Sequence, residues 1–350
     1  MGRRDFIAGL CGAVAWPLAA RAQQAAVPVV ALIAAAAFAL NSAAVAPASA
    51  AEKVQIRFTW KLKGEYAPLF VALDRGYYAA EGLDIDLAEG SGAETVVKMI
   101  GLGADKVAYG PATVVAEAIN QGLPVQVVAV YQSEVPIGLA SFPDVPLTTP
   151  KDLEGKRLGV TTGETFANLL ATFARVNHVN LAKVNTIQMN AATRGTQFIA
   201  RKLDVTSLYL SNELPLLEKK AGVKFNVLKM ADFSLKVMGA SFWVNPAFAK
   251  ANPETVRKLL RATAQGYVDA KKDYRAAAEI MEKHMPVKID RDVLEQQVAA
   301  TLDSTSDPNG RPVGWQDDAE WASNLDLLKG AGVIKDVKDP HVYYTNQYLR

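Results

Sequence analysis

Small and polar residues cluster at several places where short apolar runs end, and their chemistry suits hydrogen bonding to a small molecule. Hydroxyl, amide, carboxylate and ammonium groups donate or accept hydrogen bonds, and glycines let the backbone approach a ligand closely. In chain order, the candidate ligand-binding residues are Lys63, Tyr66, Ser91, Gly92, Tyr109, Pro111, Ala112, Thr113, Tyr131, Thr162, Gly163, Thr165, Arg194, Tyr209, Asn212 and Glu213. The pattern indicates a binding site divided among several loops.

The sequence lacks the signatures of common catalytic and metal sites. It contains no G-x-S-x-G elbow, no H-E-x-x-H helix and no P-loop. The single cysteine is Cys11, and the three histidines, His178, His284 and His341, lie outside the predicted cleft loops. Beyond the N-terminal segment, disulfides, cysteine-ligated zinc and a cysteine nucleophile are therefore excluded. We expect no catalytic residue, no metal and no cofactor.

Alternating strands and helices must position the clusters of the first half. Apolar patterning predicts strands over residues 54–60, 83–89, 106–110 and 124–132. Helical periodicity, with proline and glycine at the helix ends, predicts helices over residues 67–82, 92–103 and 111–122. This order is typical of an α/β fold with a largely parallel sheet.

A proline-rich stretch between Pro136 and Pro150 interrupts this pattern, and a second α/β unit follows it. Strands are predicted over residues 157–161, 184–189, 205–210, 225–231 and 237–244, and helices over residues 165–178, 192–203 and 212–222. The chain from residue 245 onward is mostly helical, and we expect this helical block to pack onto the first unit.

The repeated order predicts an α/β protein with two lobes. Residues 51–135 and 245–350 would form the first lobe, and residues 136–244 the second. Two crossings, near residues 133–139 and 239–244, would join the lobes as a hinge with a ligand cleft between them. In such sheets, ligands bind beyond the carboxyl ends of the strands, where helix N-termini favour oxyanions.

Each cluster also has a purely structural explanation. Gly-Ser-Gly at residues 90–92 can be a turn, and Thr162 can be a helix cap. Tyr66 and Tyr109 can lie at the edge of the core with satisfied hydroxyls, and Lys63 can be solvated. The sequence leaves both sets of explanations open.

Residues 1–50 have the composition of a targeting segment. Arg3 and Arg4 precede an apolar run, as in twin-arginine leaders, and a second apolar run ends in Ala48-Ser49-Ala50, a suitable cleavage site. We predict export to the periplasm with cleavage near Ala50, and the alternative is an N-terminal membrane anchor.

The remaining 300 residues carry no net charge. The whole chain has a formal charge of +2, and residues 1–50 contribute three arginines and one aspartate, which leaves 35 basic and 35 acidic residues. A neutral chain lacks the basic field that nucleic-acid binding requires. We expect no nucleic-acid partner.

Several fragments resemble the periplasmic solute-binding proteins of bacterial ABC importers. The resemblance is narrower to the nitrate, sulfonate, taurine and thiamine-pyrimidine (NMT1-like) branch. It rests on APLFVALDRGYYAAEGLDIDL, EGSGAETVVKMIGLGADKVAYGPA, AINQGLPVQVVAVYQ, TPKDLEGKRLGV and YLSNELPLLE, in this order. It implies two α/β lobes of the type II periplasmic-binding-protein fold, a hinge of two strands and a ligand trapped in the cleft. It also implies a monomer that delivers its solute to a membrane permease and its ATPase.

The segment from Tyr209 to Glu213 is similar to the tyrosine–asparagine–glutamate pattern with which thiamine-pyrimidine binders hold an aminopyrimidine. The ring can stack on a heterocycle, Asn212 can donate and accept, and Glu213 can accept from amino groups. A cleft carboxylate disfavours sulfonate or nitrate, whereas Arg194 in the cleft would favour an anion. Alternatively, Asn212 and Glu213 cap a helix and Arg194 lies on a helix surface.

Two other functions share this frame. A periplasmic sensory module would also close around a solute and then present it to a receptor. The related fungal pyrimidine synthase uses an active-site histidine and a cysteine-rich motif, and this chain has neither at the predicted cleft. The sequence therefore favours binding without chemistry.

Overall fold

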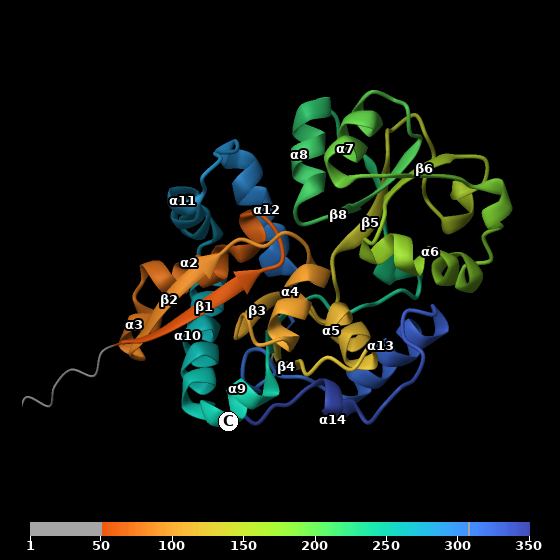
Figure 1. The fold of residues 1–350 in the computed structure, drawn as a ribbon. Helices are drawn as coiled ribbons and strands as arrows, with labels where there is room; N and C mark the ends of the chain where they lie inside the picture. Colours follow the sequence, from red (N-terminus) through yellow and green to blue (C-terminus); the bar gives the residue numbers. More distant parts are fainter. Residues whose placement is uncertain (1–50, 307–308) are drawn as a thin grey trace, which may run out of the picture. The chain divides into compact units, whose positions relative to one another are not determined.

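The computed structural model describes residues 51–306 and 309–350, and the predicted targeting segment, with Cys11, lies outside the described residues. The strands are β1 (Glu52–Phe58), β2 (Leu83–Ala88), β3 (Val107–Pro111), β4 (Gln126–Val130), β5 (Ile137–Ser141), β6 (Arg157–Thr161), β7 (Asn185–Met189), β8 (Val205–Tyr209), β9 (Asn226–Lys229) and β10 (Ala240–Val244). They form two separate sheets, each covered by helices (Figure 1).

The helices follow the predicted order with small changes at their ends. They are α2 (Ala67–Asp74), α3 (Tyr77–Ala80), α4 (Ala93–Gly101), α5 (Ala112–Asn120), α6 (Thr165–Val176), α7 (Ala191–Ile199), α8 (Glu213–Ala221), α9 (Pro246–Ala251), α10 (Pro253–Lys272), α11 (Tyr274–His284), α12 (Arg291–Asp303), α13 (Asp318–Gly330) and α14 (Pro340–Tyr343). The helix predicted over residues 67–82 is divided because Gly76, at φ 73°, adopts a left-handed conformation between α2 and α3.

The two sheets have the same topology. The first has the order β2-β1-β3-β10-β4, and the second has the order β7-β6-β8-β5-β9. In each sheet, three neighbouring strands are parallel and the fourth strand runs antiparallel to both of its neighbours. The chain thus has the two-lobed α/β fold that the repeated element order predicts.

The antiparallel strands mark where the chain passes between the lobes. After β4 of the first sheet, the chain enters the second sheet as β5, and after β9 it returns as β10. The predicted crossings overlap these connections in part, because residues 133–136 and Gly239 lie between strands, whereas residues 137–141 and 240–244 are themselves strands. The lobe boundary expected at residue 245 remains a proposal. β10, which precedes that boundary, belongs to the first sheet.

The two connecting segments are hydrogen-bonded to each other and form the hinge. Gly239 N donates to Gln132 O over 2.8 Å, and Val135 N donates to Val237 O over 2.6 Å. The Gln132 side chain adds a bond from Ala240 N to its Oε1 at 3.2 Å. Because two paired segments must bend together, the lobes can move mainly by rotation about this hinge.

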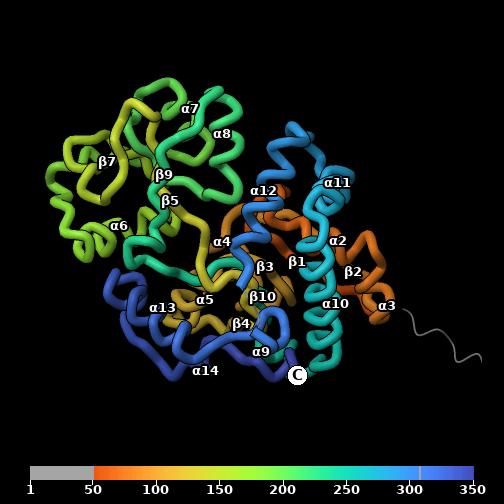
Figure 2. Tube along the Cα trace, turned by 180° about the vertical axis from the view of Figure 1, so that it is seen from behind, coloured from red at the N-terminus to blue at the C-terminus, as the bar shows by residue number. Residues whose placement is uncertain are grey.

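The helical block packs against the first lobe, as predicted, with α10 and α11 on α2 (Figures 1 and 2). Gly266 permits the close approach of α10, since a Cβ atom at this position would lie 2.3 Å from Pro68 O. The buried side chains of Phe58, Leu259 and Tyr267 join the sheet and these helices into one core. The block is therefore fixed to the first lobe.

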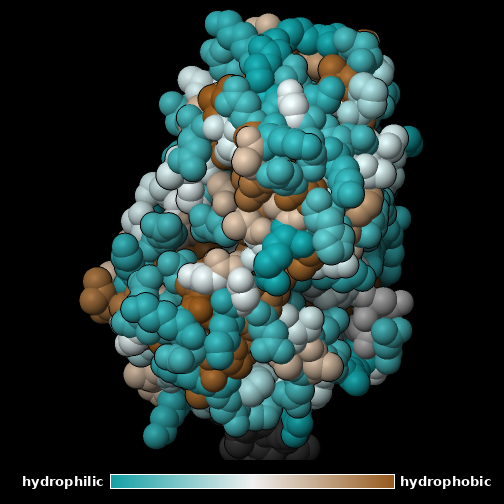
Figure 3. Space-filling view, turned by 90° about the vertical axis from the view of Figure 1, so that its right-hand side faces the viewer, coloured by the Kyte–Doolittle hydropathy of each residue, from teal (hydrophilic) through white to brown (hydrophobic). Residues whose placement is uncertain are grey.

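The described surface is mostly hydrophilic. In Figure 3 apolar colour appears in small patches and hollows among polar side chains. The exposed large apolar residues, such as Leu102 and Val287, are scattered along the sequence. Among the residues described, no helix is both long and apolar enough to span a bilayer, and no group of three or more His, Cys, Asp or Glu side chains could hold a metal ion.

Candidate functional site

A cavity of about 780 Å³ lies between the two lobes, at the carboxyl ends of the parallel strands. Its walls include the first residues of α4, α5, α6, α7 and α8 and the loop that follows β1. Volumes of this order are typical of small-molecule sites. The placement is the one expected for α/β sheets, whose helices point their N-termini toward a bound ligand.

Most of the predicted site residues line this cavity. Those that do so are Lys63, Ser91, Gly92, Tyr109, Pro111, Thr113, Thr162, Gly163, Thr165, Arg194, Tyr209, Asn212 and Glu213. Tyr66, Ala112 and Tyr131 do not line it. The structure therefore brings the predicted loops of both lobes together around one space.

The three residues that lie away from the cavity are buried in the first lobe. Tyr66 stacks on Phe58 with ring centroids 4.0 Å apart, and Tyr131 stacks on Tyr267 at 4.3 Å. Ala112 is 1% exposed, and its N–H donates to the hinge at Gly239 O over 3.0 Å. The two tyrosines were predicted as ligand-binding residues because they carry hydroxyl groups, but their rings pack against other aromatic rings in the core.

Tyr109 lines the cavity but does not offer its hydroxyl group to it. The side chain is 1% exposed, and its hydroxyl is hydrogen-bonded to the hydroxyl of Tyr267. Burial raises the pKa of Tyr109 well above its ordinary value, with a further contribution from Tyr267. At this position, a core-edge tyrosine with a satisfied hydroxyl is the better description.

Arg194 is the centre of a buried ion network in the second lobe. Its side chain is 2% exposed, so the surface alternative is wrong. Nη2 donates to both carboxylate oxygens of Glu213, at 2.6 and 2.9 Å, and Nη1 pairs with Glu164. Burial opposes the charge on the guanidinium, but Glu213 and Glu164 outweigh it and raise the pKa of Arg194.

The same network holds the loop that follows β8. Glu213 Oε2 accepts from Tyr209 N at 3.0 Å, and Ser207 contacts both Glu164 and Arg194. The carboxylate of Glu213 thus fixes Arg194 and the backbone at Tyr209, so its charge is already compensated. Tyr209 is held by this arrangement with its ring at the cavity, and burial raises its pKa to about 12.

Carboxylates also occupy the helix N-termini that face the cavity. Glu94 lies in the first turn of α4, Glu164 is the N-cap of α6, and Glu213 is the first residue of α8. A carboxylate near a helix N-terminus interacts favourably with the helix dipole, and none of these three helices has a side-chain cap hydrogen bond. Thr162, predicted as a possible cap, is not the cap residue of α6.

The first lobe contributes further acidic groups to the cavity. Lys63 Nζ lies 3.2 Å from Glu65 Oε1, so its ammonium is already paired. Burial, with a smaller contribution from Glu94, raises the pKa of the Glu117 carboxyl. In total, five glutamates, one lysine and one arginine line the cavity, which gives a formal charge of −3.

The glycine turn between β2 and α4 bonds to the neighbouring loop. Gly92 N donates to Thr59 O over 2.9 Å, and Gly90 N donates to Trp60 O over 3.3 Å. These two N–H groups therefore hold the loop after β1 in place. Ser91 and Gly92 still line the cavity, and the turn alternative accounts for the glycines themselves.

Trp60 is a cavity residue that the sequence prediction missed. It lines the cavity and its side chain is 46% exposed, unusual for so large an aromatic residue. The apolar run over residues 54–60 placed Trp60 inside a strand, whereas β1 ends at Phe58. Its position at a strand end was the available signal.

None of the three histidines lines the cavity, so the side chains there that could transfer protons are the glutamates, Lys63 and the tyrosines. His284 lies in the last turn of α11 and His341 in α14. His178 follows α6 at a positive φ of 55°. The described cavity residues are suited to holding a molecule by hydrogen bonding and ring contacts.

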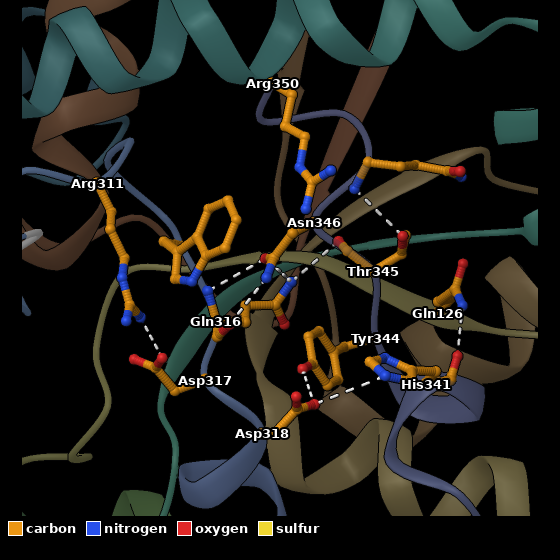
Figure 4. Close-up of a pocket in the computed structure, with 12 residues that line it drawn as sticks. Gln126, Arg311, Gln316, Asp317, Asp318, His341, Tyr344, Thr345, Asn346 and Arg350 are labelled. Carbon is orange, nitrogen blue, oxygen red and sulfur yellow. Dashed lines mark hydrogen bonds and ion pairs between the residues drawn. The ribbon is translucent and has the colours of Figure 1, made fainter.

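A second cavity, of about 640 Å³, lies on the first lobe beside the C-terminal segment (Figure 4). Its polar groups bond to one another: Gln316 pairs with Asn346, and Tyr344 with Asp318. Thr345 N also donates to Val127 O at the edge of β4 over 3.0 Å. This segment covers the outer edge of β4, whose other edge pairs with β10, and this is a structural role.

Comparison with known proteins identifies relatives of two kinds. A model described as NMT1/THI5 like matches residues 63–277. The riboflavin-binding protein RibY of Chloroflexus aurantiacus is 28% identical over 296 residues, covering 81% of this chain and 82% of that protein. The formylaminopyrimidine-binding protein of Halalkalibacterium halodurans is 24% identical, covering 80% and 85%.

Some relatives carry the names of enzymes. A 4-amino-5-hydroxymethyl-2-methylpyrimidine phosphate synthase of Legionella pneumophila is 24% identical and covers 63% of this chain and 70% of that protein.

Among solved structures, the periplasmic aliphatic sulphonate-binding protein SsuA of Escherichia coli has a TM-score of 0.65 at 14% identity, covering 83% of this chain and 91% of that one. This likeness establishes the fold, and it leaves the ligand open.

Proposed function

Because the chain belongs to the NMT1/THI5-like family, we propose that it is the solute-binding component of an ABC importer whose lobes trap an uncharged or cationic nitrogen-containing ring. The family match covers 215 of the 350 residues, including strands of both sheets. Transport partners would be a membrane permease and its ATPase. The predicted leader supports a periplasmic location.

The observation that carries the ligand proposal is the charge of the cavity. Both cationic side chains there are paired with glutamates, Arg194 with Glu164 and Glu213, and Lys63 with Glu65. An anion would therefore have to compete with groups of the chain itself for every positive partner. With a formal charge of −3 around the space, a sulfonate or nitrate would be repelled, whereas N–H groups would be attracted.

Aromatic residues of the cavity could stack on a flat ring. Trp60 lines the cavity from the first lobe and Tyr209 from the second. Stacking of such rings contributes about 0.5–1.5 kcal/mol beyond burial of area. The names of the relatives from Chloroflexus and Halalkalibacterium, which refer to riboflavin and formylaminopyrimidine, support the same class of ligand.

We propose that binding closes the lobes without altering the ligand. Cavity residues come from both lobes, so a ligand gains all its contacts only when the lobes are together, and this differential affinity drives closure. The synthase names of other relatives raise the alternative of catalysis. The described cavity lacks histidine and cysteine, which supports binding over chemistry.

A thermal-shift screen tests the ligand class. Riboflavin and an aminopyrimidine should raise the melting temperature, whereas taurine, an alkanesulfonate and nitrate should leave it unchanged at equal concentration. In the variant Trp60→Ala, the same rings should raise the melting temperature by less, because the variant lacks one stacking face. A shift with the oxyanions and none with the rings would contradict the proposal.

The partner proposal needs a separate test. The exported protein, loaded with the ligand found by the screen, should stimulate ATP hydrolysis by the permease–ATPase complex reconstituted from the same source. Stimulation of a histidine kinase instead would identify a sensory module.

A further inference from the structure

Helix α12 of the helical block lies beside α8 of the second lobe in both views (Figures 1 and 2). Lys219 Nζ, on α8, lies 2.8 Å from Asp292 Oδ2 in the first turn of α12. Further along α12, Thr301 lines the cavity. One helix therefore contacts the other lobe at its start and reaches the binding site near its end.

Gln297, between these two points, hydrogen-bonds to loops from both lobes. Its Nε2 donates to Asn212 O over 2.8 Å and to Asn212 Oδ1 over 3.0 Å. Its Oε1 accepts from Gly64 N at 3.1 Å. The side chain is 3% exposed, so this amide is buried at the junction of the two lobes.

The backbone fixes the orientation of this amide. Gly64 N–H can only donate, so the group facing it must be the oxygen of Gln297. The backbone carbonyl of Asn212 can only accept, so the group facing it must be the nitrogen of Gln297. The side chain of Asn212 must then turn its own oxygen toward Gln297, which leaves its NH₂ group for other partners.

Gly64 packs tightly against α12 at Gln297. A Cβ atom on Gly64 would lie 2.5 Å from Gln297 Cβ, so the loop that carries Lys63 packs directly on α12. Lys63 Nζ stands 5.6 Å from the ring centre of Tyr209, which belongs to the same second-lobe loop as Asn212. Both sides of the cleft thus meet at this point.

The far end of α12 is bonded to the hinge. Gln132 Nε2 donates to Ser304 Oγ over 2.6 Å, and Ser306 N donates to Tyr131 O over 2.8 Å. Ser133 N donates to Ser306 Oγ over 2.7 Å. The helix is therefore held at the hinge while its middle reaches across to Asn212.

We propose that Gln297 is a positioning residue of the binding site, which bonds the second lobe in the closed arrangement and turns the NH₂ group of Asn212 toward the ligand. This inference rests on the proposed function only in placing the ligand in the cavity. When the lobes separate, Gln297 Nε2 exchanges both Asn212 acceptors for water, so these two bonds belong to the contacts that are made only when the lobes are together. The ligand is accordingly one that presents a carbonyl oxygen or ring nitrogen to Asn212.

The test separates closure from ligand contact. Two exposed positions, Lys220 on α8 and Lys283 on α11, are replaced by cysteines and spin-labelled in a chain whose sole native cysteine carries Cys11→Ser. Electron–electron distances measure lobe separation in the ligand-free protein. Gln297→Glu replaces the donor with a second acceptor facing Asn212 O, so the two lobes should be held together less well. The distribution of spin-label distances should therefore shift toward longer values.

Two further variants keep the test decisive. Gln297→Met removes the polar group without adding a charge, and it should shift the distances in the same direction. This variant keeps the test available if Gln297→Glu does not fold. Gln296→Glu is the matched control, because Gln296 is exposed on the same helix, and it should leave the distances unchanged. Unchanged distances in both Gln297 variants would overturn the closure role.

The ligand contact is tested with riboflavin as the probe. Asn212→Asp keeps an oxygen toward Gln297, so the distances should stay as in the parent, but the loss of the NH₂ donors should weaken riboflavin binding by tenfold or more. Parent-like affinity in Asn212→Asp would overturn the orienting role. If riboflavin does not bind the parent, an aminopyrimidine is the probe for the same comparison; if neither binds, the proposed ligand class and the orienting role fail, and the ligand-free distances still decide the closure role.

Discussion

The two lobes share one sheet topology, but they prepare their sides of the cavity differently. In the second lobe, Arg194 is buried and fully occupied by Glu164 and Glu213, so its wall is a rigid ion network. In the first lobe, Trp60 and the Lys63–Glu65 pair are less enclosed. A common backbone thus supports one wall built on a buried ion network and one built on a half-exposed aromatic residue and a more accessible ion pair.

The largest expected effect comes from breaking the second-lobe network. Arg194→Met leaves two carboxylates without their partner, and such a loss typically costs about 3–5 kcal/mol of unfolding free energy. Urea denaturation measures the change. Lys63→Met in the first lobe is the matched control, and it should cost about 1 kcal/mol or less, since its ion pair is more accessible.

The triple variant Arg194→Met, Glu164→Gln, Glu213→Gln sharpens this comparison. It removes the uncompensated charges, so it should recover part of the lost stability. Equal losses for Arg194→Met and Lys63→Met would contradict the contrast between the lobes.

Trp60→Ala tests the first-lobe wall. Its side chain is 46% exposed, so the unfolding free energy should fall by about 1–2 kcal/mol, less than for a fully buried tryptophan. The affinity for riboflavin should fall by a factor of about 2–10, the equivalent of one lost stacking contact. Calorimetric titration measures the affinity. A large loss of stability with unchanged affinity would assign Trp60 to the core.

Tyr131→Phe tests the first-lobe core beneath the cavity. The Tyr131 hydroxyl is buried and has no hydrogen-bond partner among the described residues, whereas its ring stacks on Tyr267. Removing the hydroxyl should stabilise the protein by about 1 kcal/mol. Tyr109→Phe is the control and should destabilise it, because it leaves the Tyr267 hydroxyl unpaired. Stabilities measured together by thermal denaturation compare the two.

Glu117→Gln should produce the smallest change, visible in the pH dependence of stability. Burial raises the folded-state pKa of Glu117 above its ordinary 4.5, so the folded state holds this proton more tightly than the unfolded state. The carboxylate therefore lowers stability as pH rises from about 4.5 through the folded pKa. The variant should match the parent near pH 4 and exceed it at about pH 7. A difference that is independent of pH would contradict this assignment.

Local patterning predicted much of the fold and of the cavity. Strand and helix periodicity placed the turn at Ser91 and the loops at Thr162 and Asn212 at strand ends, where they line the cavity, because strand ends are set by nearby residues. Tyr66 and Tyr131 were predicted at the site but do not line the cavity, since a tyrosine suits a position in the core as well as one in a binding site. Long-range packing decides that choice.

Individual side-chain contacts between distant segments could not be predicted from local patterning. Gln297 lies 233 residues from Gly64, and nothing in the helical pattern of α12 distinguishes it from Gln296 except which face is buried. The partners of Arg194 were similarly hidden, because Glu164 and Glu213 belong to different strand–helix units. Tertiary structure assembles these polar groups, and spacing along the chain does not reveal it.

Calorimetric titration of the purified protein with riboflavin, an aminopyrimidine and an alkanesulfonate, followed by mass spectrometry of the recovered ligand, tests the central claim most directly. The account predicts one-to-one binding of a ring compound, no heat from the sulfonate, and recovery of the ligand unchanged. Tight binding of the sulfonate, or recovery of a converted product, would contradict it.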